Sequence, residues 1–452
     1  MSKHVLFQKI VYFCILEMRN REILRLALPS IIQNITVPLL GLVDLTIVGH
    51  MGATRYIAAV SVGSMIFNVI YWLLGFLRMG SSGLTSQALG RRDFPAVKGV
   101  LLQTILLGLT ISLCFIVLQI PLLWVALKLM VPSADGMEST ETLAPLVSSY
   151  FNICIWGAPA VLCLYGLTGW FIGMQNTRTP MFVAIGQNLM NILLSLVFVY
   201  VMGMKIEGVA LGTLLAQWGG LFLALFLWRK YYGGRSVMKV TACQMAYRKF
   251  FKVNRDIFLR TICLVAVNLF FTMAGSQQGE IMLSVNTLLM TLFMLFSYVM
   301  DGFAFAGEAL CGKYYGARNA EGFHQTVSGL FRWGALMALM FTLCYVIGGN
   351  TFLGLLTNEE SVIQAAQPFF WWAVAVPAAG VAAFIYDGVF IGIAESRGML
   401  ISCGIAAMAF FIIYFSLFSL YGNHALWIAL LAYLFLRGLI QSIYLKKRHV
   451  ME

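Results

Sequence analysis

Acidic side chains inside apolar runs are the residues of this sequence best suited to carry out chemistry. Asp44 lies in the stretch PLLGLVDLTIVG with no cation beside it. A carboxylate at the centre of a membrane helix costs roughly 2.5–3.5 kcal/mol on insertion scales, so intramembrane acids usually serve ion or substrate binding. Asp387 follows Tyr386 in a second apolar run, and Asp301 and Glu308 lie seven residues apart on one helical face in a third. Such carboxylates could take up H⁺ or Na⁺, or pair with a cationic compound.

The composition places these acids in a membrane. Of the 452 residues, 60% are hydrophobic and only 11% are charged, whereas soluble proteins carry about 25% charged residues. Apolar stretches long enough to cross some 30 Å of hydrocarbon recur from end to end. The sequence therefore predicts an all-α polytopic membrane protein. Its twelve expected spans are 24–48, 57–88, 97–127, 145–172, 180–203, 208–228, 254–276, 281–310, 323–348, 362–392, 399–420 and 424–444.

The basic residues indicate how these spans cross the membrane. Of the 30 Lys and Arg residues, 23 lie in the tails and in alternate loops on one side, and only Arg55, Lys128 and Lys205 lie in the loops on the other. Positive charge marks the cytoplasmic side, so both termini are expected there. The net charge of +12 thus reflects membrane topology, and no nucleic-acid partner is expected.

The two halves of the chain are related in sequence. A shift of 226 residues brings QALGRRD (87–93) onto KYYGARN (313–319), and a shift of 219 brings FIGMQNTR (171–178) onto FIGIAESR (390–397). Six spans per half give a parallel repeat, which is typical of carriers with two lobes around a central cavity. The expected parts are a cytoplasmic segment 1–23, an N-lobe 24–228, a cytoplasmic linker 229–252, a C-lobe 253–445 and a cytoplasmic tail 446–452.

Several long motifs identify a family. The segments 26–52, 76–93, 166–180, 286–319 and 386–397, which include LALPSIIQNITVPLLGLVDLTIVGHMG and YDGVFIGIAESR, resemble the multidrug and toxic compound extrusion (MATE) transporters, most of all their DinF-like branch. The resemblance implies twelve helices in two pseudo-symmetric six-helix lobes. It also implies export of amphipathic, often cationic compounds in exchange for H⁺ or Na⁺.

The resemblance also suggests a coupling site in the N-lobe. The family's archaeal and DinF-type site joins the helix 1 acid, here Asp44, to an Asn and a second Asp on helix 5 and a Thr on helix 6. In this sequence the Asn is Asn191 and the Thr is Thr213, but the second acid is replaced by Ser195. Asn188, one turn before Asn191, is a further candidate ligand. One carboxylate with neutral oxygen ligands binds a metal cation more weakly than two carboxylates do. We therefore expect H⁺ rather than Na⁺ to be the coupling ion.

Two prolines precede Asp44 in the same span. Pro29 and Pro38 each remove an intrahelical hydrogen bond and permit a bend. Proton uptake by Asp44 would then let this helix repack or bend.

The C-lobe has its own candidates for a substrate cavity. Asp387, with Tyr386, falls on helix 10, where another branch of the family places a coupling acid. That branch also needs a Glu on helix 7, where this chain offers Asn268 as the best polar residue. Asp301 and Glu308 on helix 8 complete the candidate set.

These observations predict a secondary-active, proton-coupled multidrug efflux antiporter of the bacterial inner membrane, working by alternating access as a monomer among membrane lipids. We expect no enzymatic activity, no metal and no cofactor beyond the coupling ion. One alternative is a flippase for lipid-linked precursors, which would need a cationic cavity. The other is a non-transporting receptor or scaffold. The flippase is disfavoured because only four arginines lie within spans. These are Arg78, Arg260, Arg332 and Arg437.

Overall fold

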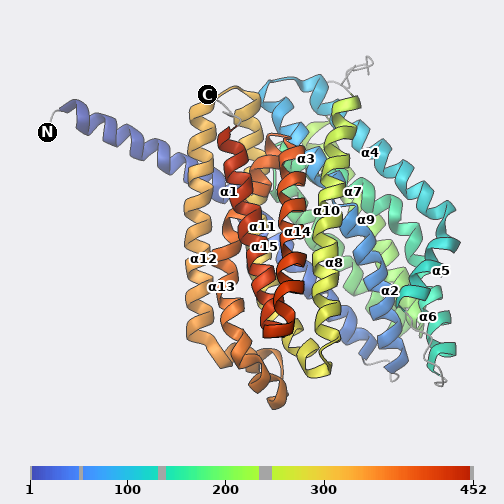
Figure 1. Cartoon of the computed structure of the whole chain (residues 1–452). Helices are drawn as coiled ribbons and strands as arrows, with labels where there is room; N and C mark the ends of the chain where they lie inside the picture. The colour runs from blue at the N-terminus through green and yellow to red at the C-terminus, as the bar shows by residue number, and fades with distance from the viewer. Residues whose placement is uncertain (1–2, 50–53, 131–138, 234–246, 448–452) are drawn as a thin grey trace.

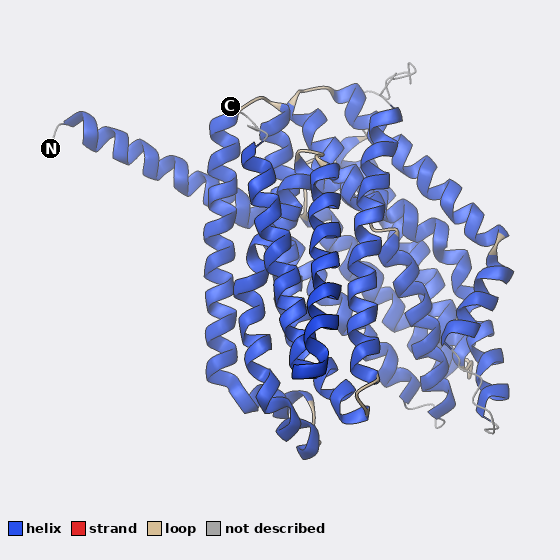
Figure 2. Ribbon diagram, in the orientation of Figure 1, coloured by secondary structure: helices blue, strands red, loops and turns tan. Residues whose placement is uncertain are grey.

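The protein is a bundle of long helices, seen here in a computed structural model that describes residues 3–49, 54–130, 139–233 and 247–447. No strand occurs in these ranges (Figure 2). The helices are α1 (Lys3–Gly49), α2 (Thr54–Leu73), α3 (Phe76–Gly90), α4 (Phe94–Val117), α5 (Gln119–Met130), α6 (Ser139–Cys154), α7 (Ala158–Gly173), α8 (Arg178–Leu196), α9 (Ile206–Tyr232), α10 (Tyr247–Ser276), α11 (Glu280–Gly316), α12 (Ala320–Leu356), α13 (Glu360–Gly392), α14 (Ser396–Tyr421) and α15 (Asn423–Lys447). Short η1 (Ile155–Gly157) and η2 (Val197–Val201) continue α6 and α8.

The membrane spans follow the predicted apolar stretches closely. Eleven segments of the described chain are long and apolar enough to cross a membrane, and α1 contains the predicted span 24–48. The expected span 97–127 is divided between two helices, since α4 ends at Val117 and α5 begins at Gln119, and the expected span 57–88 is likewise divided between α2 and α3. Pro121 lies in the first turn of α5, where its missing N–H and fixed φ favour the start of a new helix.

The internal repeat is also present in the backbone. Arg92 and Arg318, which the 226-residue shift superimposes, have φ of 58° and 55°. Gln175 and Ala394, which the 219-residue shift superimposes, have φ of 63° and 52°. Positive φ is uncommon outside glycine, so its recurrence at matched turns marks two copies of one helical arrangement.

The two halves meet along a close-packed seam at one end of the bundle, near the turns that follow α3 and α11. There α3 packs against α11 and α13. A Cβ added at Gly316 would overlap the carbonyl oxygen of Gln87, and one at Gly90 would overlap the carbonyl oxygen of Lys313. Only glycine permits such backbone contact across the seam.

Polar bonds reinforce the seam. The Arg78 guanidinium of α3 pairs with the Glu308 carboxylate of α11 at 3.1 Å. The Ser86 hydroxyl donates to the Glu308 carbonyl oxygen at 3.1 Å, and the Gln175 side chain donates to the Ala309 carbonyl oxygen at 2.7 Å. The halves are therefore held together at this end by an ion pair as well as by backbone packing.

Helix α1 contacts both halves. Its N-terminal part extends away from the bundle (Figure 1), and the part that follows packs on α11, where the Asn34 amide donates to the Tyr298 carbonyl oxygen at 3.2 Å. Only two residues later, the carbonyl oxygen of Thr36 accepts a 3.2 Å hydrogen bond from Asn188 of α8. The predicted lobe limits assign this span to the N-lobe alone, whereas its contacts divide it between the two halves.

Candidate functional site

A cavity of about 300 Å³ lies among the helices of the first half. Among the described residues its walls carry no charged side chain and combine hydroxyl, amide and aromatic groups. The lining residues are Gly41, Val60, Ser61, Ser64, Phe67, Asn68, Tyr71, Tyr150, Cys154, Gln187, Asn191, Thr213 and Gln217.

Three of the predicted coupling residues meet at the wall of this cavity. The Asn191 amide of α8 donates to the Thr213 hydroxyl of α9 at 3.1 Å. Ser195, one turn after Asn191, donates to the Asn191 side-chain oxygen at 3.5 Å. Asn191 and Ser195 are buried. Asn188 points elsewhere, since its amide bonds to α1 at Thr36.

Helix α1 brings Asp44 into the neighbourhood of this cavity. Gly41 belongs to the cavity lining, and Asp44 follows it by three residues in the same continuous helix. The side chain of Asp44 lies outside those that the structure describes. The helix continues through both Pro29 and Pro38, so bending at these positions stays a prediction.

Sequence reasoning missed several polar residues of the cavity. Ser61, Ser64 and Asn68 on α2 line it, and their spacing of three and four residues places them on one helical face. That spacing within an apolar span was a usable signal. The Tyr71 hydroxyl and the Gln217 side-chain oxygen are buried without a hydrogen-bond partner in the described part of the chain. Both groups are therefore available to a ligand.

The candidate Asp387 lies in a buried cluster of the second half. Its carboxylate pairs with Arg260 of α10 and, at 3.3 Å, with Arg437 of α15. Gln441 donates to its other oxygen at 2.9 Å. All four residues are less than 9% exposed. Two guanidiniums thus face the single carboxylate of Asp387.

The other second-half candidates have different direct partners, although Asp301 and Glu308 lie within electrostatic range of Asp387. Glu308, 1% exposed, joins the halves through Arg78 and does not line the cavity described above. Asn268 bonds to the Leu264 carbonyl of its own helix at 2.9 Å, and the Tyr386 ring packs edge-on against a neighbouring phenylalanine. Asp301 is partly buried and has no hydrogen-bond or ion-pair partner in the described ranges. The structure therefore brings together Asn191, Ser195 and Thr213 of the N-lobe set, whereas the C-lobe acids Asp301 and Glu308 interact with Asp387 only through electrostatics and not by direct contact.

Comparison with known proteins agrees with this architecture. The MatE family model matches residues 29–197 and 257–417, one segment in each half. The chain belongs to the MatE family. It is 35% identical to the DNA damage-inducible protein F of Escherichia coli strain K12 over 437 residues, covering 96% of this chain and 94% of that protein. It is also 18% identical to the multidrug export protein MepA of Staphylococcus aureus, over 91% of this chain and 90% of that one.

Solved structures show the same fold. A multidrug resistance MATE family transporter of the MOP superfamily, in an outward-facing conformation, matches with a TM-score of 0.80 at 20% identity, over 95% of this chain and 96% of that one. The predicted family and the all-α polytopic membrane fold are thereby confirmed. The MatE chain is a multi-pass membrane transporter, and its relatives are transporters rather than enzymes.

Proposed function

We propose that this MatE chain exports amphipathic, often cationic compounds by proton-coupled antiport with alternating access. The observation that carries the proposal is the position of α1. This helix packs on α11 in the second half, lines the N-lobe cavity with Gly41, and carries the intramembrane acid Asp44 one turn later. A change in charge at Asp44 would therefore act on both the cavity and the contact between the halves.

The closed seam corresponds to the cytoplasmic side in this proposal. The turns near Gly90 and Gly316 carry Arg91, Arg92 and Arg318, and basic loops are typically cytoplasmic. The described conformation would then face outward, across the bacterial inner membrane. Solved relatives of this fold include structures described as straight and as bent, which supports a cycle with more than one conformation.

The cavity favours compounds that combine aromatic rings with a few polar groups. Its described lining offers two tyrosines, one phenylalanine and several amides and hydroxyls but no charged side chain. Cavities that bind varied ligands typically have apolar walls with a small number of polar groups. The relatives named as multidrug proteins are in keeping with such a range. Asp44 would supply the negative charge that attracts cationic members.

A flippase for lipid-linked precursors is disfavoured by the arginines. Arg260 and Arg437 both pair with the single carboxylate of Asp387, and Arg78 pairs with Glu308. Asp301 lies within electrostatic range of all three arginines. These three guanidiniums therefore do not form the free cationic cavity that a pyrophosphate group would need.

Reconstituted vesicles test the proposed function directly. The purified protein should drive a fluorescent amphipathic cation against its gradient when a pH gradient is imposed, and much less when a sodium gradient is imposed. A dye that equilibrates at the rate of protein-free vesicles under both gradients would contradict antiport. Accumulation driven by sodium alone would contradict proton coupling.

The glycine contact in the seam gives a prediction about conformation. Gly316→Ala should weaken the closed seam, because its Cβ would overlap the Gln87 carbonyl oxygen. Overpacking costs about 1–3 kcal/mol, which shifts a conformational equilibrium by roughly 5- to 150-fold. Spin labels on α3 and α11 near the seam should report longer distances by pulsed electron paramagnetic resonance.

Gly404→Ala on α14 is the matched control, since a Cβ there meets nothing within 4 Å. Its label distances should equal those of the parent protein. Unchanged distances in Gly316→Ala as well would mean that the seam adjusts and does not set the conformation.

A further inference from the structure

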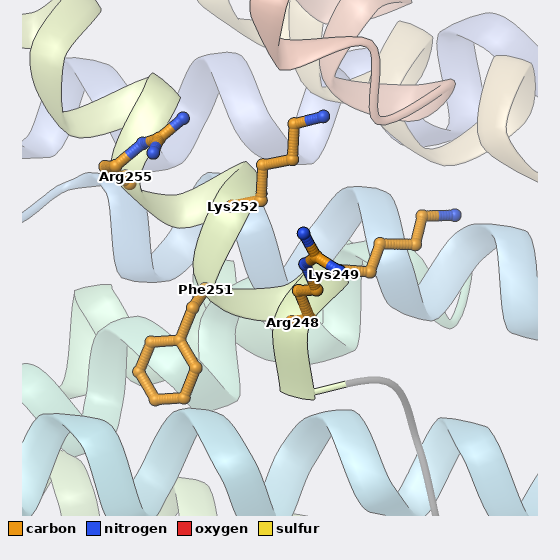
Figure 3. Close-up of a pocket in the computed structure, with 5 residues that line it drawn as sticks. All are labelled: Arg248, Lys249, Phe251, Lys252 and Arg255. Atoms are coloured by element: carbon orange, nitrogen blue, oxygen red, sulfur yellow. The ribbon is translucent and has the colours of Figure 1, made fainter.

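The first two turns of α10 form one wall of a basic groove. The groove has a volume of about 900 Å³ and is lined by Arg248, Lys249, Phe251, Lys252 and Arg255. Figure 3 shows the cationic side chains fanning out from consecutive turns of one helix, with the Phe251 ring on the same stretch. All five side chains are exposed. The described lining of the groove thus combines four cations with one aromatic ring and includes no acid, while Glu395 lies within electrostatic range of Lys249.

The cations differ in how far they are already neutralised. Arg255 pairs with the buried Asp256 carboxylate at 2.9 Å. Lys249 donates to the Gln87 side-chain oxygen at 3.4 Å, and Gln87 is neutral. Neither Arg248 nor Lys252 forms an ion pair in the described ranges of the chain. Their spacing of four residues places them on one face of α10, so together they present a doubly charged surface.

The depth of the groove favours the headgroup layer of a bilayer. Helix α10 has 30 residues and is about 45 Å long at 1.5 Å per residue, whereas the hydrocarbon core is about 30 Å thick. At least one end of α10 therefore extends beyond the hydrocarbon, and the four cations of its first turns indicate that this is the N-terminal end. Just below them, Phe250 is buried against Leu84 of α3 and Val100 of α4, so the floor of the groove lies where the two halves meet.

We propose that this groove is a binding site for the headgroup of an acidic phospholipid. Arg248 and Lys252 would contact the phosphate, and Lys249 and Arg255 would contribute positive potential. Phe251, 52% exposed, would lie against the glycerol and the upper acyl chain. Basic pockets between transmembrane helices at this depth commonly bind anionic headgroups. The site is separate from the transport cavity and does not depend on the proposed substrate or coupling ion.

A lipid fits the groove better than a free anion does. A dissolved phosphate would need only the cations, and an exposed phenylalanine beside them would contribute nothing to its binding. A phospholipid brings an apolar portion that can cover Phe251, at the depth where glycerol and the first methylenes lie. The cations of the groove and the exposed Phe251 ring therefore favour a ligand that has both a negative charge and an apolar portion.

Native mass spectrometry of the full chain tests this site. Phosphatidylglycerol and phosphatidylcholine would be titrated separately into the detergent-solubilised protein, and the first bound lipid counted. Each basic residue near a headgroup strengthens binding about fivefold, so Arg248→Gln with Lys252→Gln should weaken phosphatidylglycerol binding by roughly 25-fold. Phosphatidylcholine binding should stay unchanged.

The control pair is Lys446→Gln with Lys447→Gln at the end of α15. It removes the same charge from exposed positions at the other end of the second half's sequence, and it should leave the first lipid bound as in the parent protein. If phosphatidylglycerol binding weakened equally in both double variants, the lipid would be held by general attraction to a positive surface. That result would refute a specific site in the groove. Thermal unfolding in neutral detergent would verify that both pairs are folded.

Phe251→Ser separates a lipid from a free anion. It should weaken phosphatidylglycerol binding several-fold while leaving all four cations in place. Inorganic phosphate added as a competitor at millimolar concentration should displace little of the lipid. Displacement by phosphate together with an unchanged affinity in Phe251→Ser would show an anion site and refute the lipid assignment.

Discussion

Asp387→Asn is expected to destabilise the folded protein by about 3–5 kcal/mol, the cost of removing one partner from a buried ion pair. Arg260 and Arg437 both contact this carboxylate, and each is 4% exposed. An asparagine keeps the shape of the side chain but leaves two buried guanidiniums without the carboxylate that contacts them. The midpoint of thermal unfolding in detergent should therefore fall sharply, and the amount of folded protein in the membrane should fall with it.

Arg437→Met provides the matched comparison for Asp387→Asn. It removes one of the two cations and leaves Asp387 in contact with Arg260, so a direct ion pair remains. We expect a smaller fall in the unfolding midpoint than in Asp387→Asn. The sequence alone suggested that Asp387 attracts cationic substrates. Asp387→Asn could instead keep normal stability, lose export of cationic substrates and retain export of neutral ones. That result would support the substrate-binding role of Asp387 and refute the structural one.

The membrane spans were predictable because one physical requirement determines them. A helix must keep about 20 apolar residues in the hydrocarbon, and this signal is local in the sequence. The predicted span 180–203 therefore differs by only two residues at each end from the apolar segment 178–201. The break between α4 and α5 was missed because the residues on both sides of it are apolar, so hydropathy does not show where one helix ends and the next begins.

The partners of buried charges were not predictable in the same way. Arg260 and Asp387 are 127 residues apart, and nothing in a single sequence says which in-span arginine faces which acid. The same holds for Arg78 and Glu308, which lie in different halves. The N-lobe set of Asn191, Ser195 and Thr213 could be assembled because a family resemblance, rather than spacing, placed its members on neighbouring helices.

Asp44→Asn is expected to abolish export driven by a pH gradient. Asparagine has nearly the same shape as aspartate but cannot take up a proton, so the step that couples protonation to movement of α1 would be lost. A ligand shifts a conformational equilibrium only through its different affinity for the two states, and a residue that cannot bind the proton provides no such difference. Substrate binding should remain measurable by fluorescence through the neutral groups of the described lining, although cationic substrates should bind more weakly without the charge of Asp44.

The replacement of an acid by Ser195 sharpens this prediction. Ser195 already hydrogen-bonds to Asn191 at the cavity wall, so Ser195→Asp would add a second charged oxygen ligand beside the amide and hydroxyl oxygens. Hard cations favour such oxygen ligands, so this variant should gain sodium-driven export that the parent protein lacks. Glu359→Gln, which neutralises an exposed acid at the start of α13, should behave as the parent in every assay.

If Asp44→Asn vesicles still accumulate dye against its gradient, Asp44 is structural. The coupling acid must then be sought in the second half, where Asp301 has no ion-pair partner among the described residues.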